Sequence, residues 1–220
     1  MAIEVVYEDN HIIVVLKPFN MPTQSDASND PDLLTVVKEH LKTTYNKPGA
    51  VYLGLVHRLD RPVGGLVVFA KTSKAASRLS DQLRKKEVRK EYLAMVEGTP
   101  DKERDRLTHY IAKDREKNRV RAYKHPHGDA KEAVLDYELA WTDGKVSVLK
   151  VNPITGRPHQ IRSQLSAIGH PIVGDLKYGA SSPTPNKNIM LFARGITFNH
   201  PVKKEDVTFS AKPPKGWPKI

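Results

Sequence analysis

The sequence predicts an α+β protein with a largely antiparallel sheet, organised as one domain over residues 1–220. Short segments rich in β-branched and apolar residues follow one another with turn residues between them. Isolated amphipathic segments with helical spacing interrupt this series, and the combination is typical of the α+β class. The chain has no internal repeat, low-complexity block or clear linker, which favours one domain over two.

The segment before residue 100 predicts strands interrupted by two helices. The strands are expected at 3–7, 11–16, 51–56, 66–70 and 92–96. The second strand ends at Pro18, because proline cannot donate to a ladder. Asp30 and Pro31 predict a helix start, as cap and first helical residue, and apolar residues at helical spacing follow as far as Leu41. A second amphipathic helix is predicted from Ser73 to Lys85.

The remainder of the chain predicts strands around one further helix. The most polar stretch is 101–130, and two strands at 107–111 and 119–123 are expected to form a hairpin within it. The segment 152–169 predicts a helix that starts at Pro158 and ends at Gly169. Further strands are expected at 133–139, 146–151, 188–192 and 207–210, and Trp141 and Trp217 are expected to be packing residues.

Charge and composition narrow the function classes. Lys and Arg number 36 against 25 acidic residues, and the net charge of +11 favours binding to nucleic acid, although basic proteins without that role are common. The chain has no cysteine, which excludes disulfides, thiolate metal sites and cysteine nucleophiles. No apolar run is long enough to cross a membrane and no secretion signal begins the chain, so we expect a cytoplasmic protein.

A first group of reactive side chains is His57-Arg58-Leu59-Asp60, between a predicted strand and a turn. Polar side chains at such a transition can project into a cleft, and Gly64 and Gly65 would allow a ligand or main chain to come close. Neighbouring arginines would keep Asp60 ionised, which suits a nucleophile. The alternative is a turn aspartate paired with a surface arginine.

A second group is Thr155-Gly156-Arg157-Pro158-His159-Gln160-Ile161-Arg162. The free amides of a helix start attract anions, so the segment predicts a helix that binds phosphate. A solvated basic face is the alternative.

Together the two segments resemble signature motifs of the RluA-type family of pseudouridine synthases. Residues 57–71 resemble the motif in which HRLD is followed by a small-residue turn, an apolar strand and Ala-Lys. Residues 155–179 resemble the motif TGRxHQIR followed by GxPIxGDxxYG. Residues 7–18 resemble the opening hairpin of the family, and residues 90–94 its KxY segment. The resemblance covers nearly the whole chain, in the expected order.

This resemblance implies the pseudouridine synthase fold, a mixed but mostly antiparallel sheet with flanking helices and a central catalytic cleft. It implies isomerisation of uridine in ribosomal or transfer RNA to pseudouridine, without a metal ion or organic cofactor. The catalytic aspartate of the family falls on Asp60, its tyrosine on Tyr92 and its carboxylate-pairing arginine on Arg162. Contacts with the substrate are expected from His57, Arg58, Arg157, His159 and Gln160.

Three positions depart from the family pattern. Val63-Gly64 stands where the family often has two hydroxyl residues before glycine, and a local hydrogen bond would be lost. Phe19-Asn20 replaces a small residue and glycine, although asparagine tolerates a left-handed backbone. Gln164 stands where histidine is frequent, which would alter a contact with RNA. None of these changes removes an expected catalytic group.

The expected partner is an RNA stem-loop, bound by a monomer that needs no protein partner. The opening hairpin motif begins at residue 3, so we expect no separate RNA-binding module before it. The basic stretch 101–130 is therefore a predicted RNA contact, with a solvated charged hairpin as the alternative. No metal site is expected, because cysteines and the HExxH spacing are absent.

The alternative function is a non-catalytic RNA-binding or RNA-folding protein on the same fold. Retention of Asp60, Tyr92 and Arg162 favours catalysis, because simple binding to a polyanion would not need the carboxylate.

Overall fold

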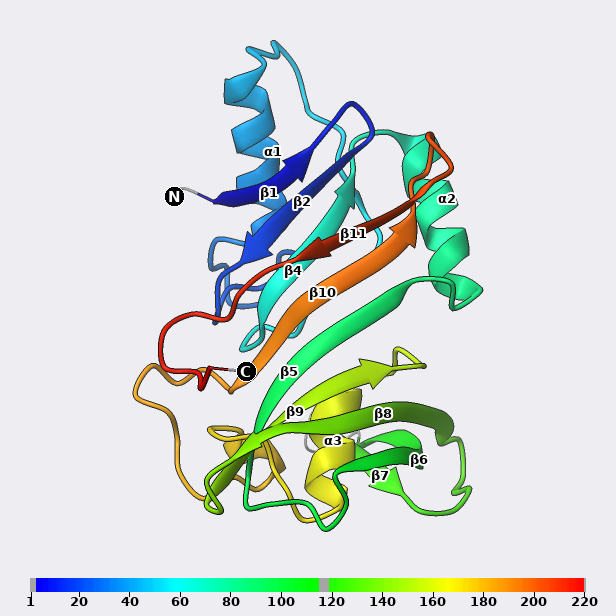
Figure 1. Cartoon of the computed structure of the whole chain (residues 1–220). Coiled ribbons are helices and arrows are strands. Elements are labelled where there is room, and N and C mark those ends of the chain that lie inside the picture. The colour runs from blue at the N-terminus through cyan, green and yellow to red at the C-terminus, as the bar shows by residue number, and fades with distance from the viewer. Residues whose placement is uncertain (1–2, 115–118, 220) are drawn as a thin grey trace. The chain divides into compact units, whose positions relative to one another are not determined.

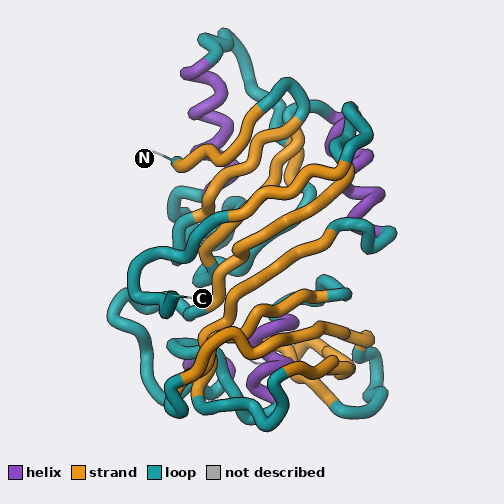
Figure 2. Tube along the Cα trace, viewed as in Figure 1, coloured by secondary structure: helices purple, strands orange, loops and turns teal. Residues whose placement is uncertain are grey.

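A computed structural model describes residues 3–114 and 119–219, so Arg115 and Lys117 of the basic stretch lie outside the described residues. The chain divides into two compact units, in both of which strands predominate (Figure 1, Figure 2). The first unit consists of Met1–Val88 and Ala193–Lys212, and the second of Arg89–Phe192 and Pro213–Ile220. The expectation of one domain over residues 1–220 stays a prediction.

The first unit is a sheet with two helices. Its strands are β1 (Glu4–Glu8), β2 (Ile12–Lys17), β3 (Gly54–Leu55), β4 (Gly64–Ala70), β10 (Leu191–Asn199, which begins in the second unit) and β11 (Asp206–Ser210). They lie in the order β1-β2-β4-β10, with β3 also paired to β4 and β11 to β10. The ladders described within the unit are antiparallel. The predicted hairpin is confirmed, and Asp9 closes its turn by accepting the N–H groups of His11 and Ile12 at 2.8 and 2.9 Å.

The core of the first unit forms between β2, β4, β10 and the second of its helices. β4 is buried at every position, as expected of a central strand. The buried cluster on one side of the sheet consists of Ile12, Val14, Leu66, Val68, Ala70, Ala75, Leu79, Ile196 and Phe198. Gly65 has φ +124°, and a Cβ there would lie 2.4 to 2.7 Å from main-chain atoms of Ala193. Only glycine therefore permits this close approach of β4 to β10.

The helices of the first unit begin at capping side chains. In α1 (Leu33–Thr44) the cap is Asp32, which accepts the N–H of Thr35 at 3.0 Å. The predicted start at Asp30-Pro31 was therefore wrong by two residues, because the Asp30 carboxylate is paired with Arg61 instead. In α2 (Ser73–Arg84) Thr72 accepts the N–H of Ala75, and the predicted bounds of this helix hold to within one residue.

The second unit is a five-stranded antiparallel sheet with short helical segments. Its strands are β5 (Arg89–Glu97), β6 (Arg104–Asp114), β7 (Arg119–Tyr123), β8 (Lys131–Thr142) and β9 (Val146–Pro153), in the order β5-β9-β8-β6-β7. The ladders between these neighbours are antiparallel. The hairpin predicted within 101–130 is confirmed as β6 and β7. Trp141 and Trp217 pack against Leu93, Met95 and Val148, as predicted.

Helix α3 (Gln160–Ala167) begins later than the sequence predicted. Pro158 precedes the helix, and His159 caps it in a left-handed conformation with φ 49°. The buried amide of Gln160 explains the delay, because it holds the preceding turn in place of helical hydrogen bonds. Gly169, with φ +86°, follows the end of the helix as predicted. A short 3-10 helix, η1 (Leu176–Tyr178), comes next.

Two predicted strands differ in extent. The segment 51–56 forms a strand only at Gly54–Leu55, and the strand predicted at 188–192 begins at Leu191 and continues to Asn199.

None of the helices within 3–114 and 119–219 is long and apolar enough to cross a membrane.

Candidate active site

Asp60 lies half-buried at the end of the segment that links β3 to β4 in the first unit. The turn that follows closes through the main chain, because the Val63 N–H donates to the Asp60 carbonyl at 3.0 Å. The Val63 side chain is buried, so an apolar residue suits this position. The departure from the family at Val63-Gly64 therefore leaves the turn closed.

Two side chains fasten the segment before Asp60 to the main chain. The Thr23 hydroxyl donates to the Leu59 carbonyl at 2.8 Å and accepts the Leu59 N–H at 3.2 Å. Nε2 of His57 accepts the Val68 N–H at 3.0 Å, beyond the last β3–β4 pair at Leu55. The imidazole thus extends the pairing with β4 while the chain leaves the strand. This bond gives His57 a positioning role, and its expected contact with the substrate stays a prediction.

Lys17 is a buried cation beside the same turn. Its Nζ donates to the carbonyls of Pro18, Met21 and Arg61 at 2.9, 2.6 and 3.0 Å, and the residue is 1% exposed. Burial lowers the pKa of Lys17 to about 7, against the opposing effect of the Asp60 carboxylate. The bond to Arg61 ties the end of β2 to the residue after Asp60. The sequence placed Lys17 in a motif but predicted no role for its side chain.

The two arginines that flank Asp60 differ in their surroundings. The Arg61 guanidinium donates to the Ser28 hydroxyl at 2.8 Å, pairs with Asp30 and lies 3.6 Å from Asp26. The bond from Arg61 lowers the pKa of the Asp30 carboxyl. Arg61 is therefore engaged with the segment 26–30, whereas Arg58 is exposed, as its expected contact with the substrate requires.

Two of the departures from the family pattern meet in space. A Cβ at Gly64 would lie 2.8 Å from Cε2 of the Phe19 ring and 2.9 Å from its Cδ2 and Cζ. The ring of Phe19 therefore fills the space that a side chain at position 64 would need. Asn20 has φ 62°, so the turn after Phe19 keeps the left-handed conformation that the sequence predicted. The two changes compensate each other next to Asp60.

Tyr92 and Arg162 belong to the second unit. Tyr92 lies in β5, 9% exposed and in register with Val151 of β9. Arg162 lies in α3, where its Nε and Nη2 donate to the two carboxylate oxygens of Asp175 at 2.7 and 2.8 Å. Both side chains are buried, and the two parallel bonds fix the guanidinium in the plane of the carboxylate. The expected pairing of Arg162 with Asp60 involves residues of different units and stays a prediction.

Tyr178 connects Arg162 to His159. The guanidinium carbon of Arg162 lies 4.9 Å from the centroid of the Tyr178 ring. The Tyr178 hydroxyl lies 2.7 Å from Nδ1 of His159 and accepts the N–H of Val120 in β7 at 3.1 Å. The sequence placed Asp175 and Tyr178 in a motif, but neither was predicted to contact Arg162.

Gln160 shapes the turn before α3. Its Oε1 accepts the Thr155 hydroxyl at 2.7 Å and the Arg157 N–H at 2.9 Å, and its Nε2 donates to the Val134 carbonyl at 3.0 Å. The residue is 4% exposed. These bonds engage both ends of the amide in supporting the turn, and the expected contact of Gln160 with the substrate stays a prediction. Arg157 is half-buried and donates from Nε to the Glu132 carbonyl at 3.0 Å, and its contact with RNA stays a prediction.

Gln164 is also an interior residue. It is 0% exposed, and its Nε2 donates to the carbonyls of Leu107 and Ala133, both at 3.1 Å. The sequence suggested that this departure alters an RNA contact, and burial corrects that suggestion. Its effect is on the packing of α3 against β6 and β8.

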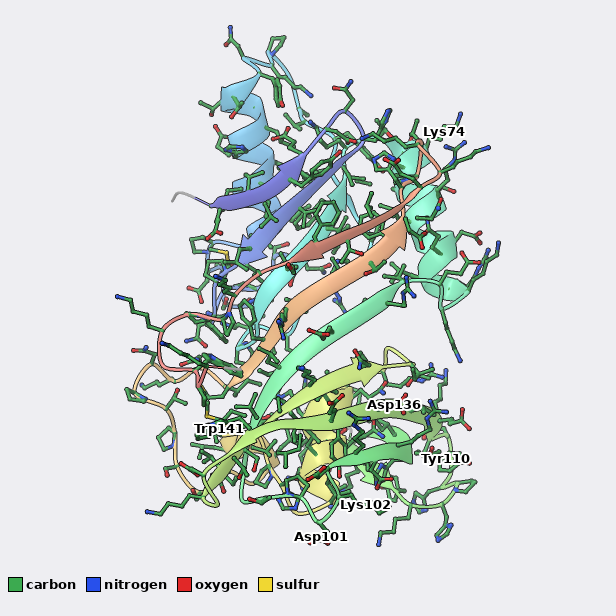
Figure 3. All side chains as sticks on the ribbon, in the orientation of Figure 1. Lys74, Asp101, Lys102, Tyr110, Asp136 and Trp141 are labelled. Atoms are coloured by element: carbon green, nitrogen blue, oxygen red, sulfur yellow. The ribbon has the colours of Figure 1, made fainter. Side chains whose placement is uncertain are left out.

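The basic stretch 101–130 carries arginines that already have carboxylate partners. Arg104 donates to Glu138 at 2.9 Å, and Arg106 makes two bonds of 2.6 and 2.8 Å to Asp136, which Figure 3 labels on β8. Nε of Arg121 lies 3.6 Å from the Asp114 carboxylate. For this part of the stretch, the pairs favour the alternative of a solvated charged hairpin. Among residues 3–114 and 119–219, no three His, Asp or Glu side chains come together as possible metal ligands.

Comparisons with known proteins agree on one family. The sequence model of the RNA pseudouridylate synthase family matches residues 11–167. The dual-specificity RNA pseudouridine synthase RluA of Haemophilus influenzae is 31% identical, over 96% of this chain and 93% of its own length. The ribosomal large subunit pseudouridine synthase C of Buchnera aphidicola is 32% identical, over 94% of this chain, which spans 66% of that relative.

A solved structure shares the fold. The human RNA pseudouridylate synthase domain containing 4 superposes with a TM-score of 0.79 over 96% of this chain and 89% of its own, at 21% identity. The sequence-based expectation of this α+β fold is thereby confirmed.

Proposed function

The chain belongs to the RNA pseudouridylate synthase family, whose members are isomerases of uridine in RNA, and we propose that Asp60 is its catalytic carboxylate. The observation that carries this proposal is the way the first unit holds Asp60. Bonds from Thr23, His57 and Lys17 reach main-chain atoms on both sides of Asp60. A main chain held in this way positions Asp60 for a reaction that depends on placement of the reacting groups.

The proposed reaction conserves all the atoms of the nucleotide except one exchangeable proton. The bond between ribose C1 and uracil N1 breaks, the base turns, and C1 bonds to C5. The proton on C5 is lost to a base, and N1 gains one. Asp60 serves the reaction by one of three routes: by adding to ribose C1, by adding to uracil C6, or by removing a ribose proton.

We assign supporting roles to two residues of the second unit. Tyr92 stacks on the uracil and accepts the C5 proton, and Arg162 stabilises the ionised form of Asp60. The pair with Asp175 supports the second assignment, because it holds the buried guanidinium in one orientation. Arg58, His57, Arg157 and His159 are assigned to the flipped nucleotide and its flanking phosphates. Flipping costs a few kcal/mol, which phosphate contacts offset in part.

The proposed substrate is a stem-loop of ribosomal or transfer RNA. Relatives are named for ribosomal large subunit RNA and for transfer RNA, which supports this range. The net charge of +11 also fits a polyanionic substrate. We propose that the enzyme acts in the cytoplasm as a monomer, without an obligate protein partner.

The test compares RNA from cells with and without the gene. We expect one or a few pseudouridines, seen as carbodiimide-dependent stops of reverse transcription, to vanish with the gene and to return with the wild-type protein. Asp60→Asn should bind the same RNA without restoring the stops. Asp136→Asn, which changes an exposed ion-paired carboxylate, is the matched control and should restore them. Full restoration by Asp60→Asn would refute the role of Asp60.

A further inference from the structure

Tyr178 is the point where three segments of the second unit meet. It ends η1, and its side chain is 7% exposed in a core cluster with Ile111, Val120 and Ala133. Helix α3 lies beside β6 and β7 in the same unit (Figure 1). The proposed reaction assigns no role to Tyr178. Its ring, however, contacts Arg162 and its hydroxyl contacts His159, and both of these residues have a proposed role.

The ring of Tyr178 holds the guanidinium of Arg162 from one side. The distance of 4.9 Å from the guanidinium carbon to the ring centroid is within the range of a cation–π contact. The carboxylate of Asp175 takes two N–H groups of the same guanidinium. Since Asp175 caps η1 and Tyr178 ends it, one short segment fixes Arg162 both by charge and by an aromatic face.

The hydroxyl of Tyr178 holds His159 from the other side. It accepts the Val120 N–H at 3.1 Å, which occupies one lone pair and leaves the hydroxyl proton available to Nδ1 of His159 at 2.7 Å. With Nδ1 as acceptor, the ring proton of neutral His159 lies on Nε2. His159 is half-buried and has φ 49°, a conformation that side chains with a Cβ rarely adopt. The contact with Tyr178 therefore holds this imidazole in position, and donation from the Tyr178 hydroxyl would place its ring proton on Nε2.

We infer that Tyr178 is a positioning residue with two separable effects. Its hydroxyl presents His159 to the RNA as an Nε2–H donor, and its ring orients Arg162 for the reaction. The kinetic part of this inference rests on the proposed function, whereas the tautomer of His159 does not. If Tyr178 only filled the core, its substitution would change the free energy of unfolding. The tautomer of His159 and the kinetics of the folded enzyme would then stay unchanged.

The first experiment needs no activity. In protein labelled with ¹⁵N-histidine, two-bond correlation spectra report which ring nitrogen carries the proton, and His159→Gln assigns the signal. We expect the Nε2–H tautomer in the wild type. In Tyr178→Phe, which keeps the ring, we expect the Nδ1–H form to become populated. A wild-type His159 protonated on Nδ1 would overturn the role of the hydroxyl.

The second experiment separates binding from catalysis. For Tyr178→Phe we expect the KM for RNA to rise about 10-fold, the usual effect of one lost hydrogen bond, with kcat within about 2-fold of the wild type. His159→Ala should raise KM by a similar factor, and the double variant should add little. Additive effects would show that the hydroxyl does not act through His159.

Tyr178→Leu, which removes the ring, should lower kcat by about 10-fold or more relative to Tyr178→Phe. An equal kcat in these two variants would overturn the role of the ring. Thermal unfolding of each variant shows whether it is folded, and if the leucine variant is not, Tyr178→Met tests the loss of the ring instead. An inactive wild type with the expected tautomer would contradict the proposed function and leave the hydroxyl–His159 contact standing.

Discussion

The two units hold their key charged residues in opposite ways. In the first unit, Thr23, His57 and Lys17 bind main-chain atoms around Asp60. In the second unit, Arg162 is held by other side chains, through bonds to the Asp175 carboxylate and contact with the Tyr178 ring. Hydrogen bonds to main-chain atoms hold a turn whatever side chains the turn carries. Contacts between side chains, in contrast, depend on the identity of each partner.

This difference fits two of the three departures from the family pattern, whereas the third, Gln164, lies in α3 of the second unit. Val63-Gly64 and Phe19-Asn20 both lie around the Asp60 turn, where main-chain bonds maintain the geometry. Asp175 and Tyr178, by contrast, keep the residues of the family motif. The comparison predicts that substitutions cost most in the second unit and least where ion pairs are exposed.

The largest effect is expected from Asp175→Asn. The change removes the charged acceptor of two bonds from a buried arginine, and we expect the free energy of unfolding to fall by about 3 kcal/mol. Urea unfolding measures this loss. Asp136→Asn removes the partner of an exposed arginine and should cost less than about 1 kcal/mol. Equal losses in the two variants would contradict the contrast between buried and exposed pairs.

Lys17→Met tests the hydrogen bonds to main-chain carbonyls, and its loss in free energy of unfolding should be the next largest. At high pH Lys17 is a neutral amine whose two N–H groups serve the three carbonyls, and we expect their removal to cost about 2 kcal/mol.

The difference from the wild type should depend on pH. Folding lowers the pKa of Lys17 from its ordinary value near 10.5 to about 7. Between these two pH values the unfolded chain therefore binds more protons than the folded protein. Wild-type stability relative to the methionine variant should therefore rise with pH across this window. Parallel stability curves, measured by urea unfolding from about pH 6 to about pH 10, would show that Lys17 does not titrate as stated.

Gly64→Ala probes the contact between the two departures. The added methyl would lie 2.8 Å from the Phe19 ring, and the unfolding free energy should fall by about 1 to 2 kcal/mol. Phe19→Leu in the same chain should recover part of the loss, as a double-mutant cycle would detect. A cycle with no coupling would mean that the ring moves aside at little cost.

The smallest effect is expected from Arg106→Ala. Because Asp136 already takes two bonds from this arginine, its loss should change the affinity for RNA by less than about 2-fold. Arg58→Ala, at an exposed arginine beside Asp60, is the contrasting variant and should weaken binding by about 10-fold. Filter binding at fixed salt measures both. A larger loss in Arg106→Ala would restore β6 as an RNA contact.

Local patterns in the sequence predicted most of the fold. Hairpins and amphipathic helices depend on neighbouring residues, and the turn at Asp9 and helix α2 formed as expected. The start of α1 did not, because Asp30 and Asp32 are equally good caps and a distant arginine engages the first. The late start of α3 likewise depends on bonds from Gln160 to a remote strand.

The candidate site was predictable where a motif named the residue. Asp60, Tyr92 and Arg162 came from the family resemblance, and their roles stay predictions. The burial of Lys17 and Gln164 could not be foreseen, because both residue types are usually exposed and their partners lie elsewhere in the chain. Such burial depends on satisfied hydrogen bonds, which only the tertiary structure reveals.

The close approach of Gly65 to Ala193 has a consequence for synthesis on the ribosome. The first unit is interrupted in the sequence by the main segment of the second, so β4 emerges well before the residues of β10 that pair with it. Synthesis proceeds at about 5–20 residues per second. The early part of the first unit therefore waits for seconds with the edge of β4 that pairs with β10 exposed. The main segment of the second unit, Arg89–Phe192, has emerged by the time Ala193 and the following residues of β10 arrive. Folding of that segment during the delay would bring the two ends closer and lower the entropy lost when β10 pairs with β4.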